Sequence, residues 1–161
     1  MKKKLKISGA DNVREYIIRE IEEEDLKNGF FQTLTNLTYV GNPNLERAKE
    51  VLRLIKNNPL HRIYVSVDTH SNEVLGATTL LVEPKFIHDC GSIGHIEDVV
   101  TRDSYQGQGI GTALVRRTIK DALEANCYKT ILDCSENNIP FYEKLGFRRH
   151  GIEMRLDLKG V

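Results

Sequence analysis

A glycine-rich stretch between a predicted strand and a predicted helix constrains this chain more than any other feature. It reads Gln-Gly-Gln-Gly-Ile-Gly over residues 106–111, follows a strand pattern that contains Val99-Val100, and opens an apolar helical repeat that continues to Leu123. Alternate glycines let backbone N–H groups approach a ligand, and the positive end of a helix attracts an anion. Glycines alone favour an ordinary turn, and the spacing fits neither a Walker loop nor a dinucleotide fingerprint. In this context the stretch predicts a phosphate or pyrophosphate site.

The apolar periodicity of the whole chain predicts one α/β domain with a mixed sheet and helices on both faces. Strands are expected over residues 15–19, 62–68, 73–82, 93–101 and 129–134, helices over 22–37, 44–56, 110–125 and 138–145, and a closing hairpin from 147–149 and 152–158. The basic N-terminus predicts a flexible tail over residues 1–13, followed by a domain over residues 14–161.

Composition excludes several partners. The 161 residues carry 23 Lys plus Arg and 23 Asp plus Glu, so no overall field favours nucleic acid or an anionic membrane. No run approaches the length of a membrane span or the core of a secretion signal. Cys90, Cys127 and Cys134 lack metal-type spacing, which predicts no metal site and a reducing, cytoplasmic compartment. Cys134 is expected to be an inert core thiol rather than a nucleophile.

The pattern Gln-x-x-Gly-x-Gly after Glu-Asp-Val-Val resembles the acetyl-CoA loop of the GNAT superfamily of N-acetyltransferases, and the resemblance spans about residues 75–154. It implies the single-domain acyl-CoA N-acyltransferase fold, a mixed and mostly antiparallel sheet flanked by helices on both faces, with acetyl-CoA as co-substrate. The cofactor residues it implies are Val99, Val100, Thr101, Gln106, Gly107, Gln108, Gly109, Ile110, Gly111, Thr112, Asn138 and Tyr142.

Acetyl transfer to an amine needs a polarised thioester carbonyl and a stabilised leaving thiolate. The resemblance assigns the first role to the backbone N–H of Val99 and the second to the Tyr142 phenol, with Asn138 on the pantetheine arm. Strict alternation puts Glu97 and Val99 on one face of their strand and Asp98 on the other. Neither face is purely apolar, which is compatible with a β-bulge that frees backbone groups.

Several segments resemble the glucosamine 6-phosphate N-acetyltransferase family more narrowly. They are Lys85-Phe86-Ile87-His88, Gly94-His95-Ile96-Glu97-Asp98-Val99-Val100, Asn126-Cys127-Tyr128-Lys129, Leu132-Asp133-Cys134 and Phe141-Tyr142-Glu143-Lys144. The substrate residues that this resemblance implies are Thr38, Lys85, His88, Glu97, Asp98, Asp133 and Arg155, with Lys85 and His88 on the phosphate. Catalytic roles fall to Tyr142, Glu97 and Asp133. One departure is Asp157, which stands where the family tends to carry a basic residue, so Arg155 and Lys159 are the candidate replacements.

The resemblance therefore implies a cytoplasmic homodimer that makes N-acetyl-D-glucosamine 6-phosphate and CoA on the route to UDP-N-acetylglucosamine. Three alternatives stay open: acetylation of another small amine, acetylation of a protein N-terminus, and a non-catalytic acyl-CoA sensor. The acceptor of the amine proton also stays open between Glu97, Asp133 and solvent.

Overall fold

The structure is a computed structural model that describes residues 4–8 and 13–158. These residues form two compact units, a larger one that ends at Ile131 and a smaller one that begins at Leu132. The strands of the larger unit are β1 (Lys4–Ser8), β2 (Val13–Glu20), β3 (His61–Asp68), β4 (Val74–Pro84), β5 (Ser92–Thr101) and β6 (Cys127–Ile131). Its helices are η1 (Glu23–Leu26), α1 (Phe30–Leu34), α2 (Leu45–Lys56), α3 (Ile87–Cys90), η2 (Asp103–Tyr105) and α4 (Ile110–Glu124). The smaller unit contains η3 (Glu136–Asn138) and α5 (Ile139–Glu143).

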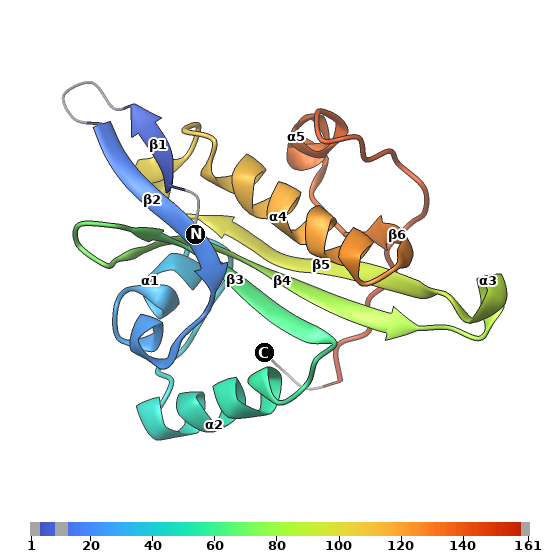
Figure 1. The fold of residues 1–161 in the computed structure, drawn as a ribbon, viewed down its shortest axis with the longest axis horizontal. Helices are drawn as coiled ribbons and strands as arrows, with labels where there is room; N and C mark the ends of the chain where they lie inside the picture. Colours follow the sequence, from blue (N-terminus) through green and yellow to red (C-terminus); the bar gives the residue numbers. More distant parts are fainter. Residues whose placement is uncertain (1–3, 9–12, 159–161) are drawn as a thin grey trace. The chain divides into compact units, whose positions relative to one another are not determined.

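The six strands form one sheet in chain order, from β1 to β6 (Figure 1). The first five pair antiparallel, and β5 pairs with β6 in parallel. A parallel neighbour requires a crossover connection, and α4 supplies it. The predicted mixed, mostly antiparallel sheet is therefore confirmed.

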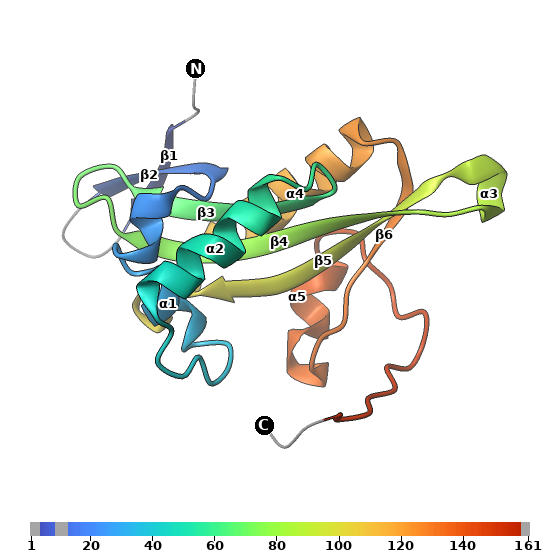
Figure 2. The same ribbon diagram turned by 90° about the horizontal axis from the view of Figure 1, so that it is seen from below.

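Helices cover both faces of this sheet. Figure 2 shows α1 and α2 on one side and α4 on the other. The core residues divide in the same way, because Tyr64, Leu75 and Leu80 pack with residues of α4, whereas Val65 and Ala77 pack with residues of α1 and α2. Strands β3 and β4 are buried on both faces, which explains their nearly continuous apolar sequences.

A buried charge cluster fixes α4 to the sheet. The Tyr64 hydroxyl donates to a carboxylate oxygen of Asp121, although both side chains are almost fully buried. Arg117 donates to both oxygens of Asp121, at 2.9 and 3.2 Å, and its guanidinium lies 4.8 Å from the centre of the Tyr64 ring. Burial, with the Asp121 hydrogen bond, raises the pKa of Tyr64 to about 12, so the phenol stays a donor. A buried carboxylate is tolerated here because it is both paired and hydrogen-bonded.

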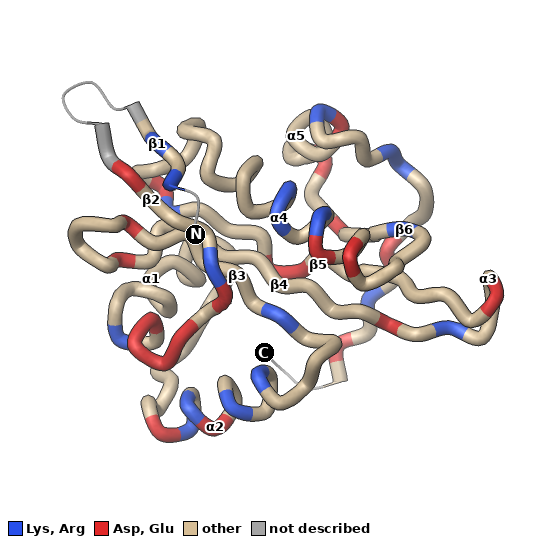
Figure 3. Tube along the Cα trace, in the orientation of Figure 1, with Lys and Arg blue, Asp and Glu red and all other residues tan. Residues whose placement is uncertain are grey.

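Figure 3 shows acidic and basic residues on most elements, with one continuous acidic stretch between β2 and α1. The acidic segment before α1 is matched by α2, where Lys49 reaches Glu23 at 3.1 Å and Glu46 at 3.2 Å. Among the helices within residues 4–8 and 13–158, none combines the length and apolar character that crossing a membrane would require.

The single helix expected over residues 22–37 is wrong. The chain forms η1 and α1 instead, separated around Gly29, whose φ of 94° is left-handed and stops helix propagation. The acidic residues Glu22 and Asp25 form a capping box at η1, so they start a short turn rather than a long helix.

Part of the tail expected over residues 1–13 lies outside the described residues, and the part that the structure describes includes a strand. Residues Lys4–Ser8 form β1, which pairs antiparallel with β2. Ile7 is 3% exposed, and Leu5, on the same strand face, packs against the core around Tyr64. The lysines alternate with these apolar residues, so the basic composition concealed a strand pattern.

The C-terminal part of the sheet differs from expectation. The strand expected at residues 129–134 is β6, which ends at Ile131 and exposes much of its length. Cys134 lies after this strand and is exposed, so the expectation that its thiol is part of the core is wrong. Among the described residues, no strand follows β6, and the predicted hairpin over 147–158 is absent. Apolar side chains that alternate with charges need a partner strand to become buried, and the smaller unit provides none.

The buried cluster generates a stability prediction. Replacing Tyr64 by Phe leaves the Asp121 carboxylate buried without one donor, so the free energy of unfolding should fall by roughly 1–3 kcal/mol. Urea-induced unfolding measures the change. Tyr39→Phe is the matched control, because Tyr39 is 87% exposed, and it should stay within about 0.5 kcal/mol of the unsubstituted protein. Equal stability of Tyr64→Phe would show that the hydroxyl contributes nothing.

Candidate active site

A β-bulge interrupts β5 just before its C-terminal end. Ala77 of β4 pairs with Val100 and Thr79 pairs with Glu97, so Asp98 and Val99 together oppose a single residue of β4. Asp98 has a φ of 52°, and the ladder is broken at this point. The predicted bulge is confirmed, and it leaves the Val99 backbone outside regular pairing.

The bulge also changes which side chains share a face. Ala77 and Thr79 lie on one face of β4, so their partners Val100 and Glu97 lie on one face of β5. Simple alternation put Glu97 and Val100 on opposite faces, and that expectation is wrong beyond the bulge. Val100 is 5% exposed and packs in the core below α1 and α2, so Glu97 points to that side of the sheet.

The glycine loop follows directly and leads into α4. Gly107 and Gly109 have φ values of 74° and 84°, both in the left-handed region that side chains disfavour. A Cβ built on either glycine would have no atom within 4 Å, so this side of the loop is open. The first N–H groups of α4, which begins at Ile110, have no acceptor within the helix. Together with the helix dipole they form a site suited to an anion such as a diphosphate.

Two predicted cofactor residues support the loop with their own side chains. The Gln106 amide donates to the Thr101 carbonyl oxygen at 3.3 Å and to Asp103 at 2.9 Å. The Gln108 amide donates to the Ser104 carbonyl oxygen at 3.2 Å. Both glutamines therefore stabilise the loop conformation. The groups left available to an anion are backbone N–H groups of the loop and of the first turn of α4, which includes Gly111 and Thr112.

A charge chain lies at the far end of the β4–β5 hairpin. Lys85 is paired with one oxygen of Glu83, and His95 Nε2 lies 2.9 Å from the other. These two contacts lower the pKa of Glu83, chiefly through the hydrogen bond from Lys85. The cation predicted to bind phosphate is thus already oriented by a carboxylate.

His88 occupies the tip of the same hairpin, in α3. Its ring packs against that of Tyr128 of β6, with ring centres 4.4 Å apart and ring planes tilted by 43°. His88, Asp89 and Cys90 all have positive φ values, from 51° to 59°, so α3 is a left-handed turn rather than a helix. Such a conformation costs roughly 1–2 kcal/mol per residue, and the Tyr128 contact helps to hold it.

Thr38 lies after α1 and is exposed, with its N–H donating to the Leu34 carbonyl oxygen at 3.2 Å. Nothing in the contacts of Thr38 distinguishes it from other residues of this turn.

The remaining predicted residues lie in the smaller unit. Tyr142 of α5 is 8% exposed and packs edge-to-face against Phe141 and Phe147, with ring centres 4.9 and 5.9 Å apart. Burial, with a smaller contribution from Cys134, raises the pKa of Tyr142 to about 12. The phenol therefore keeps its proton at neutral pH and can donate it.

Three further candidates are exposed in this unit. Asn138 precedes α5, Asp133 follows β6 by two residues, and Arg155 is paired with Asp157 at 2.6 Å. The charge of Arg155 is thus offset by Asp157, which stands where a basic residue was expected. Lys159, the other candidate replacement, lies outside the described residues.

The profile of the Acetyltransferase (GNAT) family matches residues 20–147. The chain belongs to the GNAT acetyltransferase family. A glucosamine 6-phosphate N-acetyltransferase of Candida albicans is 40% identical over 140 residues, which cover 86% of this chain and 93% of that protein. A probable glucosamine 6-phosphate N-acetyltransferase of Drosophila melanogaster is 39% identical over 130 residues, or 81% of this chain and 59% of the relative. The crystal structure of glucosamine-6-phosphate N-acetyltransferase from Arabidopsis thaliana matches with a TM-score of 0.87 and 32% identity, covering 89% of this chain and 99% of that one.

The sequence analysis assigned no role to three residues that surround the predicted Lys85 and His88: Glu83, His95 and Tyr128. Glu83 and Lys85 are two residues apart in a strand pattern, so their common face was readable from the sequence. The contact of Tyr128 with His88 joins residues 40 positions apart, and only the folded sheet creates it.

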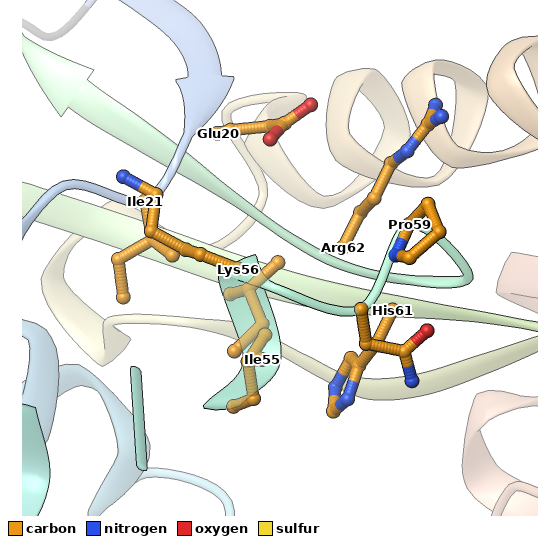
Figure 4. A pocket seen from close by; sticks show the side chains of 9 residues that line it. Glu20, Ile21, Ile55, Lys56, Pro59, His61 and Arg62 are labelled. Atoms are coloured by element: carbon orange, nitrogen blue, oxygen red, sulfur yellow. The ribbon is translucent and has the colours of Figure 1, made fainter. Parts of the chain in front are cut away.

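A hollow in the GNAT domain lies at the end of β2. Its lining residues are Glu20, Ile21, Ile55, Lys56, Asn58, Pro59, His61, Arg62 and Ile63. Figure 4 shows His61 and Arg62 projecting in opposite directions, as consecutive strand residues do. Burial lowers the pKa of His61, and the charge of Asp98 partly opposes this shift. The hollow contains none of the predicted site residues.

Within the part of the chain that the structure describes, no group of three or more His, Cys, Asp or Glu side chains could hold a metal ion.

Proposed function

We propose that this GNAT enzyme transfers the acetyl group of acetyl-CoA to the amine of D-glucosamine 6-phosphate, giving N-acetyl-D-glucosamine 6-phosphate and CoA. The observation that carries the proposal is the open glycine loop at the end of a bulged strand, in a chain whose relatives are named for this reaction. The family match extends over residues 20–147, which supports the proposal that residues 14–161 act as one domain.

The donor site consists mainly of backbone. Residues 107–112 bind the CoA diphosphate through N–H groups of the loop and of the first turn of α4. The N–H of Val99, released by the bulge, donates to the thioester oxygen as negative charge develops there. Val100 and Thr101 continue this strand end beside the pantetheine arm, which Asn138 also contacts.

The acceptor site combines carboxylates and cations. Lys85, oriented by Glu83, and His88 bind the sugar phosphate, while Thr38, Glu97 and Asp98 line the sugar. Asp133 orients the amine. Arg155 is the candidate third cation for the phosphate, and its pairing with Asp157 weakens that contribution.

The chemical step is direct attack in a ternary complex. The amine nitrogen forms a bond to the thioester carbon and the carbon–sulfur bond breaks. The thiolate takes its proton from Tyr142, whose pKa of about 12 keeps the phenol protonated at neutral pH. The amine loses a proton to Glu97 or Asp133, or through either to water.

We further propose that the enzyme is a cytoplasmic homodimer on the route to UDP-N-acetylglucosamine. The three cysteines are all free, as expected in a reducing compartment. Ile152, Met154, Leu156 and Leu158 alternate with charged residues and are 82–91% exposed. Four apolar side chains in strand spacing favour pairing with the same segment, or a strand edge, of a second copy.

Incubation with acetyl-CoA and a panel of amines tests the reaction. Glucosamine 6-phosphate should release CoA fastest and should gain one acetyl group by mass spectrometry. Unphosphorylated glucosamine is the matched control for the phosphate site. Preference for another small amine or a protein N-terminus would replace the proposed acceptor. Tight CoA binding without turnover on any amine would instead indicate a sensor.

Tyr142→Phe tests the leaving-group role. Loss of one donor to developing charge should lower kcat by roughly 10²-fold, with little change in KM for acetyl-CoA. Steady-state kinetics under conditions where chemistry limits the rate measure this effect. Phe141→Leu in the same aromatic cluster is the control for packing, and it should change kcat far less. An unchanged kcat in Tyr142→Phe would remove the phenol from the mechanism.

The dimer proposal predicts a particle of twice the 18.4 kDa chain mass. Sedimentation velocity should show this dimer, and the double variant Met154→Lys, Leu156→Lys should sediment as a monomer because charges replace apolar contacts. The double variant Glu153→Gln, Asp157→Asn changes the opposite face of the same segment and should remain dimeric. A monomeric unsubstituted enzyme would contradict the proposal.

A further inference from the structure

Arg102 is the first residue after β5 and opens the segment that leads to the glycine loop, yet only 8% of it is exposed. Neither the predicted cofactor residues nor the predicted substrate residues include it. Burying a guanidinium is costly unless its N–H groups are hydrogen-bonded and its charge is paired. The contacts of Arg102 must therefore compensate for the cost of burying its guanidinium.

The guanidinium donates to four acceptors. Nη1 donates to a Glu73 carboxylate oxygen at 2.5 Å, and Nε donates to the Thr33 hydroxyl at 3.1 Å. Nη2 donates to the Gly29 carbonyl oxygen at 3.3 Å and to the Gln32 side-chain oxygen at 3.4 Å. Arg102 thus has one anionic partner and three neutral ones. The planar guanidinium directs its N–H groups to all four, which the single ammonium group of a lysine could not do.

These acceptors belong to separate segments of the larger unit. Glu73 lies between β3 and β4, whereas Gly29, Gln32 and Thr33 belong to the start and body of α1. Thr33 extends the connection, since its hydroxyl donates to the Val74 carbonyl oxygen at 2.9 Å. The α1 helix, the β3–β4 turn and the end of β5 therefore meet at one side chain.

The backbone of Arg102 is fixed as well. Its N–H donates to the Leu75 carbonyl oxygen at 2.9 Å, and its own carbonyl oxygen accepts from the Tyr105 N–H at 2.8 Å. The second bond closes the turn η2, from which the chain enters the glycine loop. Arg102 is therefore held by both side-chain and backbone contacts, at the start of the segment that leads to the glycine loop.

Gly29 is shaped for this contact. A Cβ at Gly29 would lie 2.0 Å from Nη2 of Arg102, and the φ of 94° disfavours a side chain there independently. The glycine that ends the expected long helix is the same residue that makes room for the guanidinium.

We infer that Arg102 is a positioning residue for the donor site, which holds the start of the glycine loop against α1 and the β3–β4 turn and so sets the affinity for CoA. This inference rests on the proposed cofactor site. An anion site made of backbone N–H groups binds well only when the loop is ordered before binding, because each residue ordered on binding weakens the affinity.

Arg102→Met tests the role, with CoA itself as the titrant in isothermal calorimetry. The dissociation constant for CoA should rise on the order of tenfold. The KM for acetyl-CoA should rise in parallel, whereas kcat should change much less, because the reacting groups are untouched. Arg102→Lys keeps the charge but not the fork, so it should restore only part of the affinity.

Arg117→Met is the matched control, because it removes another Arg–carboxylate pair, one that lies in the middle of α4 and away from the glycine loop. It should lower the melting temperature and leave CoA affinity within about twofold. Equal CoA affinity in Arg102→Met and the unsubstituted protein, or equal weakening in both arginine variants, would overturn the positioning role.

A second variant guards against misfolding of Arg102→Met. Glu73→Gln removes only the anionic partner, and Glu73 is partly exposed, so the fold should tolerate it. It should weaken CoA binding by about threefold, and unchanged binding would count against the inference. If the unsubstituted protein binds no CoA, the proposed function and this inference both fall, whereas CoA binding that ignores these substitutions overturns only the role of Arg102.

Discussion

The interrupted pairing of β4 and β5 is the constraint on which the site depends. On both sides of the bulge the strands remain antiparallel, so Asp98 and Val99 are the only residues the ladder can release there. The extra residue brings Glu97 to the same face as Val100, so one carboxylate and one core residue share a side of β5. Without the bulge, the backbone groups of Val99 would take part in the regular hydrogen bonding of the sheet, and Glu97 would lie on the face opposite Val100.

The glycine loop makes this strand end suited to an anion through backbone geometry. Left-handed glycines and the N-terminus of a 15-residue helix direct N–H groups outward, while Gln106 and Gln108 brace the loop from within. The buried cluster around Asp121 fixes the same helix farther along its length. The loop therefore follows the anchored end of β5 and leads into a helix that is fixed separately, well beyond its first turn.

Local patterns predicted most elements because their signals are short-range. The helix expected at residues 44–56 is α2, Leu45–Lys56, since Asn44 caps it and its apolar residues recur on one face. The failures share a cause, which is dependence on a distant partner. The helix is interrupted at Gly29, whose carbonyl oxygen accepts a hydrogen bond from the distant Arg102. Strand β1 likewise forms because β2 pairs with it. The segment from Ile152 to Leu158 has a strand pattern but no pairing partner among the described residues of the chain.

By itself, the sequence determined the family and the glycine loop, and it indicated irregular strand pairing near Asp98, because each depends on neighbours within a few positions. Only the tertiary structure decided that His95 contacts Glu83, that Tyr128 packs against His88 and that Arg102 contacts three separate segments. Those contacts depend on strand register and on the space left by other residues, and a linear pattern encodes neither directly.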